Sequence, residues 1–146
     1  MNGLSEIHHI LNAFSEENMT ESFTKIVNSQ SYKITPVGVC ATIVAFFRQN
    51  ETNGNLIMYN FLKFLFDAIQ DPKLEVQINF LFLWIRASDE TALDYQIQIL
   101  EEHASQLRKC EIEYPGKNTF CHLAIAQLMQ RCSTFILPDD NCNFND

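Results

Sequence analysis

Apolar residues recur along this chain at intervals of three and four, the spacing of one face of an α-helix, and no segment keeps the alternation of a half-buried strand for long. The pattern predicts an all-α fold of about seven helices. Polar stretches separate the helices, among them a loop at residues 28–31. The expected helical ranges are 4–14, 20–29, 36–49, 55–69, 72–87, 89–109 and 118–137.

Two of these helices have strong start signals. Thr35-Pro36 and Asp71-Pro72 each combine a side chain able to cap a helix N-terminus with a proline, which needs no backbone N–H at the first helical position. The two signals lie 36 residues apart, a spacing typical of helical-hairpin repeats. Two architectures fit this pattern: a short armadillo/HEAT-like stack of α-hairpins, or a compact bundle.

The helix expected at residues 72–87 contains the longest apolar run of the chain, residues 80–85. A helix that is apolar on all sides must be enclosed by its neighbours. We therefore expect this helix to be the buried central helix of the fold, with Trp84 in the core.

Length and charge narrow the class of protein. The 146 residues suit a single all-helical domain, expected over residues 1–137, with an acidic and flexible C-terminal tail over residues 138–146. Eighteen Asp and Glu against ten Lys and Arg give a net charge of -8, which disfavours nucleic acid as a partner. The longest apolar run is far too short to cross a bilayer, so no membrane partner is expected.

The cysteines and the N-terminal residues indicate a compartment. The five cysteines are an odd number and show no C-x-x-C spacing, which favours free thiols. The first residues lack the basic and apolar segments of a secretion signal. We therefore expect a cytoplasmic or nuclear, reducing location.

Motifs for nucleotide binding, serine hydrolysis and zinc proteolysis are absent, so we expect neither an enzyme nor a cofactor. A bound metal is not expected either, because structural zinc ligands come in closely spaced pairs. The alternative is a metal- or thiol-dependent enzyme. Its candidate residues are Cys110, Cys121, Cys132, His103 and His122.

The twelve phenylalanines carry the functional hypothesis, because several of them fall off the main apolar stripes of their helices. Such rings either pack on a second layer of the core or lie exposed. Phenylalanines exposed together would form an apolar patch, which marks a partner surface. The acidic residues concentrate in the C-terminal two-thirds of the chain. The candidate partner-binding residues are Tyr59, Phe61, Phe64, Phe80, Phe82, Glu101 and Glu102.

These features predict a non-catalytic protein–protein interaction module, an adaptor or scaffold subunit. It would bind a peptide or helix of another protein in a Phe-rich groove with an acidic rim. The partner segment should be apolar with basic flanks, because such flanks complement the acidic rim. A second alternative is a structural homo-oligomer built through the same patch.

Overall fold

The structure, a computed structural model, describes residues 4–49, 53–68, 75–87 and 90–103. All regular structure within these ranges is helical, which confirms the all-α prediction there. The described elements are α1 (Leu4–Asn12), η1 (Glu16–Asn18), α2 (Met19–Val27), α3 (Gln30–Ile34), α4 (Pro36–Gln49), α5 (Gly54–Ala68), α6 (Glu75–Ala87), η2 (Glu90–Ala92) and α7 (Leu93–Glu102), where η marks a short 3-10 turn.

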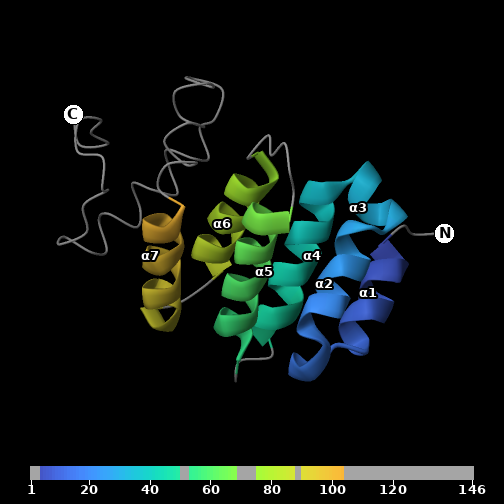
Figure 1. Cartoon of the computed structure of the whole chain (residues 1–146), viewed down its shortest axis with the longest axis horizontal. Coiled ribbons are helices and arrows are strands. Elements are labelled where there is room, and N and C mark those ends of the chain that lie inside the picture. Colours follow the sequence, from blue (N-terminus) through green and yellow to red (C-terminus); the bar gives the residue numbers. More distant parts are fainter. Residues whose placement is uncertain (1–3, 50–52, 69–74, 88–89, 104–146) are drawn as a thin grey trace.

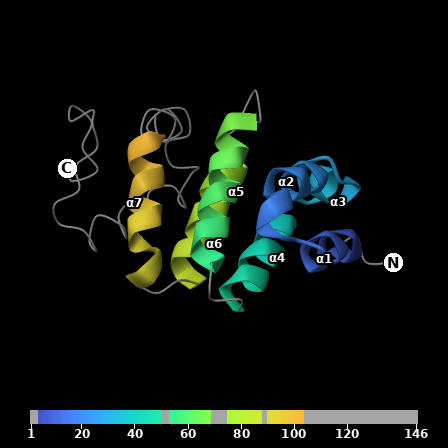
Figure 2. The same ribbon diagram turned by 60° about the horizontal axis from the view of Figure 1, so that its bottom comes forward.

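The helices follow one another along the long axis of the molecule. Helices α1 to α3 lie at one end and α7 lies at the other, with α4, α5 and α6 between them (Figure 1). Helix α4 packs against α1, α3, α5 and α6, and α7 packs against α5. Figure 2 shows α5 and α6 running alongside each other, with α7 next to them. The packing is compact, and α4, α5 and α6 form its middle.

Helix α3 was not expected, because residues 28–31 have the polar composition of a loop. Ser29 explains the difference. Its backbone is extended, and its Oγ accepts a hydrogen bond from the Tyr32 N–H at 3.1 Å while donating one to the Ile26 carbonyl at 2.6 Å. One serine therefore ends α2 and caps the next helix, so that a short helix replaces the loop.

Helix α4 begins at Pro36, as its start signal predicts. The second start signal, Asp71-Pro72, lies outside the described residues. The helix that it was expected to begin, α6, is described from Glu75 onward. The same holds for the helix expected at 118–137, for the tail at 138–146 and for the end of the helix expected at 89–109.

The core confirms the burial expected for the helix at 72–87. In α6 the fully buried side chains include Ile78, Phe80 and Trp84. The indole Nε1 of Trp84 donates a hydrogen bond to Asn55 Oδ1 on α5 at 3.0 Å, so its polar atom is satisfied inside the fold. A series of aromatic rings joins α2, α5 and α6 through the pairs Phe23–Phe61, Phe61–Phe80 and Phe80–Trp84, whose centroids are 5.1, 5.2 and 6.5 Å apart.

Candidate functional site

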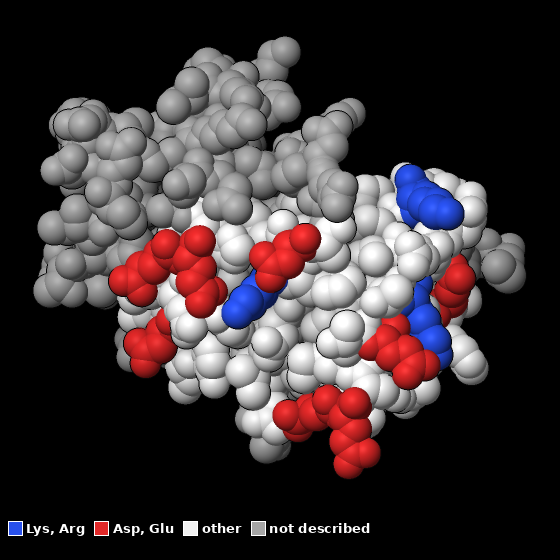
Figure 3. Space-filling model, viewed as in Figure 1, with Lys and Arg blue, Asp and Glu red and all other residues white. Residues whose placement is uncertain are grey.

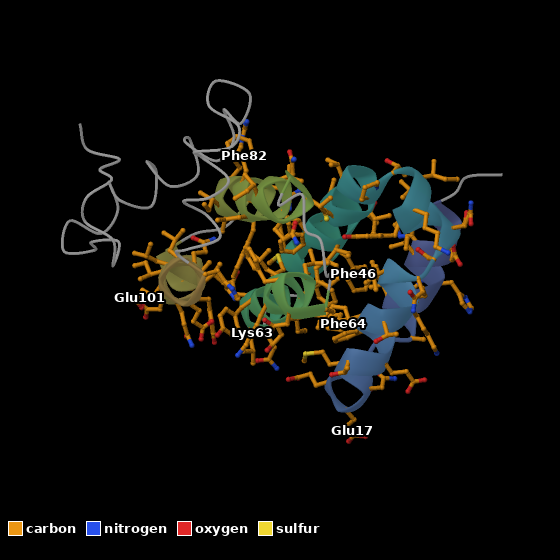
Figure 4. The ribbon with its side chains drawn as sticks, turned by 45° about the horizontal axis from the view of Figure 1, so that its top comes forward. Glu17, Phe46, Lys63, Phe64, Phe82 and Glu101 are labelled. Carbon is orange, nitrogen blue, oxygen red and sulfur yellow. The ribbon has the colours of Figure 1, made fainter. Side chains whose placement is uncertain are left out.

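The expected Phe-rich patch does not form. Phe61 and Phe80 have no exposed surface, and Phe82 is 9% exposed, so these three rings belong to the core. Phe64 is half-buried, and its ring lies 5.7 Å from that of Phe23 on α2. Figure 4 shows Phe64 and Phe46 between α5 and the N-terminal helices. The rings off the main stripes are covered because α5 and α6 have neighbours on more than one side.

The expected acidic rim is only partly a free surface. Tyr59 is buried, and its Oη donates a hydrogen bond to Glu102 Oε1 at 2.9 Å. Burial and the Glu102 carboxylate raise the pKa of Tyr59 to about 12. Glu101 and Glu102 are both exposed, and Glu101 points outward from α7 (Figure 4). Acidic side chains gather over α7 (Figure 3), but Glu102 also ties that helix to α5.

Charge reversal should therefore affect the stability of the fold differently at the two neighbouring glutamates, Glu101 and Glu102. Glu102→Lys should lower the free energy of unfolding by about 1–2 kcal/mol, because it removes the hydrogen bond from the buried Tyr59 hydroxyl. Glu101→Lys changes the net charge equally and should stay within about 0.5 kcal/mol of the wild type. Urea denaturation of both variants measures the difference. Equal losses would show that the Tyr59 contact adds nothing to stability.

His103 caps the end of α7 and is buried, with 6% of its surface exposed. Its ring stacks on Phe66 at a centroid distance of 4.1 Å. Neither ring nitrogen has a hydrogen-bond partner among the residues that the structure describes. Burial lowers the pKa of His103, an effect that Lys63 strengthens and that the carboxylates of Asp67 and Glu102 offset only in part.

This lowered pKa predicts a pH dependence of stability. The unfolded chain takes up a proton on His103 near its ordinary pKa of about 6.5, whereas the folded chain does so only at lower pH. The contribution of His103 to stability is thus complete above that pH and is lost as the pH falls below it. His103→Phe keeps a ring against Phe66, and its free energy of unfolding should fall less between pH 7.5 and 5.5 than that of the wild type. Equal slopes in urea titrations would contradict this.

A groove lies between α4 and α6, and sequence reasoning did not find it. We call it the α4–α6 groove; its volume is about 340 Å³. Val44 and Phe82 are buried side chains on its two helices, and Leu83 is half-buried beside them. The lining residues are Ala41, Val44, Ala45, Arg48, Phe82, Leu83, Arg86 and Ala87.

Helical spacing places these residues together. Ala41, Ala45 and Arg48 follow one another at intervals of four and three, so they share one face of α4. The two alanines are exposed, and because their side chains end at Cβ they leave a hollow between the helices. On α6, Leu83 and Ala87 stand one turn apart. Alanine is a weak apolar signal in a sequence. The predicted binding surface was therefore assigned to the aromatic residues rather than to this groove.

Two arginines give the α4–α6 groove its charge. Arg48 comes from α4 and Arg86 from α6, and both are exposed. The Arg86 guanidinium lies over the Phe82 ring, 5.6 Å from its centroid. Neither guanidinium pairs with a carboxylate in the described part of the chain. The groove therefore combines an apolar floor with positive charge in an acidic protein.

The enzymatic alternative gains no support from the described residues. Cys110, Cys121, Cys132 and His122 lie outside them, and His103 is the only member of that set within them. No three His, Cys, Asp or Glu side chains in the described ranges are grouped to hold a metal ion. Burial raises the pKa of the Cys40 thiol to about 12, so this thiol is protonated at neutral pH and is a poor nucleophile.

Comparison with known proteins assigns no family. No family model matches the chain, and no curated protein or solved structure is significantly similar to it. None of the described helices combines the length and apolar character needed to span a bilayer. Inferences about function therefore depend on the arrangement of the residues themselves.

Proposed function

We propose that this chain is a non-catalytic interaction module, an adaptor or scaffold subunit, that binds an apolar segment of a partner protein in the α4–α6 groove. The groove itself carries the proposal. Its lining mixes aliphatic and aromatic side chains with two exposed arginines, a composition suited to binding rather than to bond cleavage.

The form of the groove favours a helix or extended segment as the ligand. About 340 Å³ is small for a drug-sized molecule, but it accommodates a few side chains that project from one face of a peptide. Two packed helices present an elongated depression between their exposed faces, and an amphipathic helix fits such a depression through residues spaced one turn apart. The partner segment should therefore carry Leu-sized side chains at helical spacing.

The acidic side chains over α7 are a second candidate surface (Figure 3). Glu101 is exposed there, and the rings of Tyr59 on α5 and Tyr95 on α7 lie 5.8 Å apart. This surface would suit the apolar segment with basic flanks that the sequence predicts. It lacks a described hollow, so we place it second.

Selection of peptides tests the proposal. A displayed library of random peptides of about twelve residues would be selected on the wild-type protein, and the recovered peptides would be measured on Ala45→Trp, which fills the α4–α6 groove. We expect binding to weaken at least about tenfold, because the indole occupies the space of the ligand. Ala68→Trp, at an exposed alanine near the end of α5, is the matched control.

Two results would contradict the proposal. One is a set of peptides that bind Ala45→Trp as tightly as the wild type. The other is self-association of the wild type that Ala45→Trp abolishes, which would assign the groove to a homo-oligomer.

A further inference from the structure

We infer that the segment bound in the α4–α6 groove is acidic, an apolar helix or peptide that carries Glu or Asp beside its anchoring side chains. The inference rests on the proposed function and names the partner chemistry. It reverses the charge that the sequence alone predicts for the partner, because the groove is lined by Arg48 and Arg86 and by none of the described acidic residues.

Arginine is the side chain best suited to this role. Its guanidinium is planar and weakly hydrated, and it presents N–H groups in a fork that matches a carboxylate. Arg86 is already oriented, since its guanidinium lies over the ring of Phe82. A cation–π contact uses none of the hydrogen bonds that the guanidinium can donate to a carboxylate, so the Arg86 N–H groups can bind a carboxylate while the contact with the ring is kept.

The two arginines come from different helices, and this arrangement makes the groove selective for ligands whose carboxylates reach both of them. Arg48 stands on α4 and Arg86 on α6, with the apolar floor of Val44 and Leu83 in the same groove. A ligand that satisfies both must place its apolar side chains on the floor and carboxylates within reach of both helices. A basic segment would bring its own cations against these two guanidinium groups, where like charges cost free energy.

The positive charge of the groove attracts an acidic ligand, whereas the negative net charge of the whole protein repels it. The net charge of -8 repels an acidic ligand at long range. Screening limits that repulsion to about 8 Å at physiological salt, whereas a hydrogen-bonded guanidinium–carboxylate pair acts at contact. No acidic side chain in the described part of the chain is among the residues that line the groove beside Arg48 and Arg86. The contact interaction therefore decides the preference.

Three synthetic peptides of about sixteen residues test the inference. They share one stripe of leucines at helical spacing and differ only in their flanking residues, which are Glu, Gln or Lys. At low salt we expect the Glu peptide to bind the full-length protein about fivefold more tightly than the Gln peptide, and at least about tenfold more tightly than the Lys peptide. The differences should narrow at high salt.

Charge-reversed variants supply the control. The double variant Arg48→Glu with Arg86→Glu should reverse the ranking, so that the Lys peptide binds best. The double variant Lys33→Glu with Lys63→Glu changes the net charge equally at two exposed lysines outside the groove lining, and it should keep the wild-type ranking. Arg48→Gln with Arg86→Gln should abolish the ranking, and it answers the question if the reversed variant folds poorly.

The outcomes separate this inference from the proposed function. Peptides that lose affinity on Ala45→Trp but bind equally well with Glu, Gln or Lys flanks would overturn the acidic partner and leave the groove as the docking site. Tighter binding of the Lys-flanked peptide than of the Glu-flanked peptide to the wild-type protein would also overturn the acidic partner and leave the groove as the docking site. Peptides that bind none of these proteins, or that bind Ala45→Trp undiminished, would overturn both.

Discussion

Trp84→Ala is expected to lower the free energy of unfolding by about 3–5 kcal/mol. The side chain has no exposed surface, and it is the largest of the fully buried ones in the described residues. Its removal leaves a cavity in the core beside the C-terminal half of α6, because the neighbouring helices close it only in part. The variant also loses the hydrogen bond from the indole to Asn55, which leaves the Asn55 Oδ1 without that donor.

Circular dichroism during urea denaturation measures this loss. Trp84 is the only tryptophan, so its fluorescence reports unfolding in the wild type but not in the variant. Trp84→Phe keeps an aromatic ring in the cavity and should lose less stability than Trp84→Ala. A loss below about 1 kcal/mol for Trp84→Ala would place the indole at the surface and contradict the central position of α6.

Gly54→Ala is expected to cost about 2–3 kcal/mol, although alanine is the better helix former. Gly54 is buried at the first position of α5, where the chain passes against the end of α4. A Cβ at this position would overlap the carbonyl oxygen of Phe47. That oxygen belongs to the backbone of a packed helix, so relief requires a shift of α5 against α4 rather than a change of rotamer.

Gly38→Ala is the matched control, because Gly38 also lies in the first turn of a helix, α4. A Cβ there meets Thr35 Oγ1 at 2.7 Å, but a threonine side chain can rotate away. The gain in helix propensity offsets this movement, so the free energy of unfolding should stay within about 1 kcal/mol of the wild type. Equal losses in both variants would contradict the close approach of α5 to the Phe47 carbonyl.

Sequence pattern predicted the features that depend on one helix at a time. The spacing of apolar residues revealed most of the described helices, Pro36 marked the start of α4, and the all-apolar run marked the burial of Trp84. Helix α3 was not predicted, because Ser29 and its neighbours have the composition of a loop. Only the geometry of the Ser29 hydroxyl shows that they cap a helix.

The candidate site could not be predicted in the same way, because it depends on how two helices meet. Phe61 and Phe80 were candidates for partner binding because they fall off the main stripes of their helices, and neighbours on several sides of α5 and α6 bury them in the core. The α4–α6 groove arises where Ala41 and Ala45 on one helix face Leu83 and Ala87 on another. The spacing of residues within one helix does not show which face of another helix will pack beside it.

Methyl NMR of the Glu-flanked peptide bound to the full-length protein locates the docking surface residue by residue. If the α4–α6 groove is the docking site, the methyl signals of Ala41, Ala45, Leu83 and Ala87 shift on binding, because these side chains line the groove. The methyl signals of Leu93 on α7 should stay in place. Shifts at Leu93 without shifts at the four groove residues, or no shifts at saturating peptide, would contradict the assignment of the groove as the interaction surface.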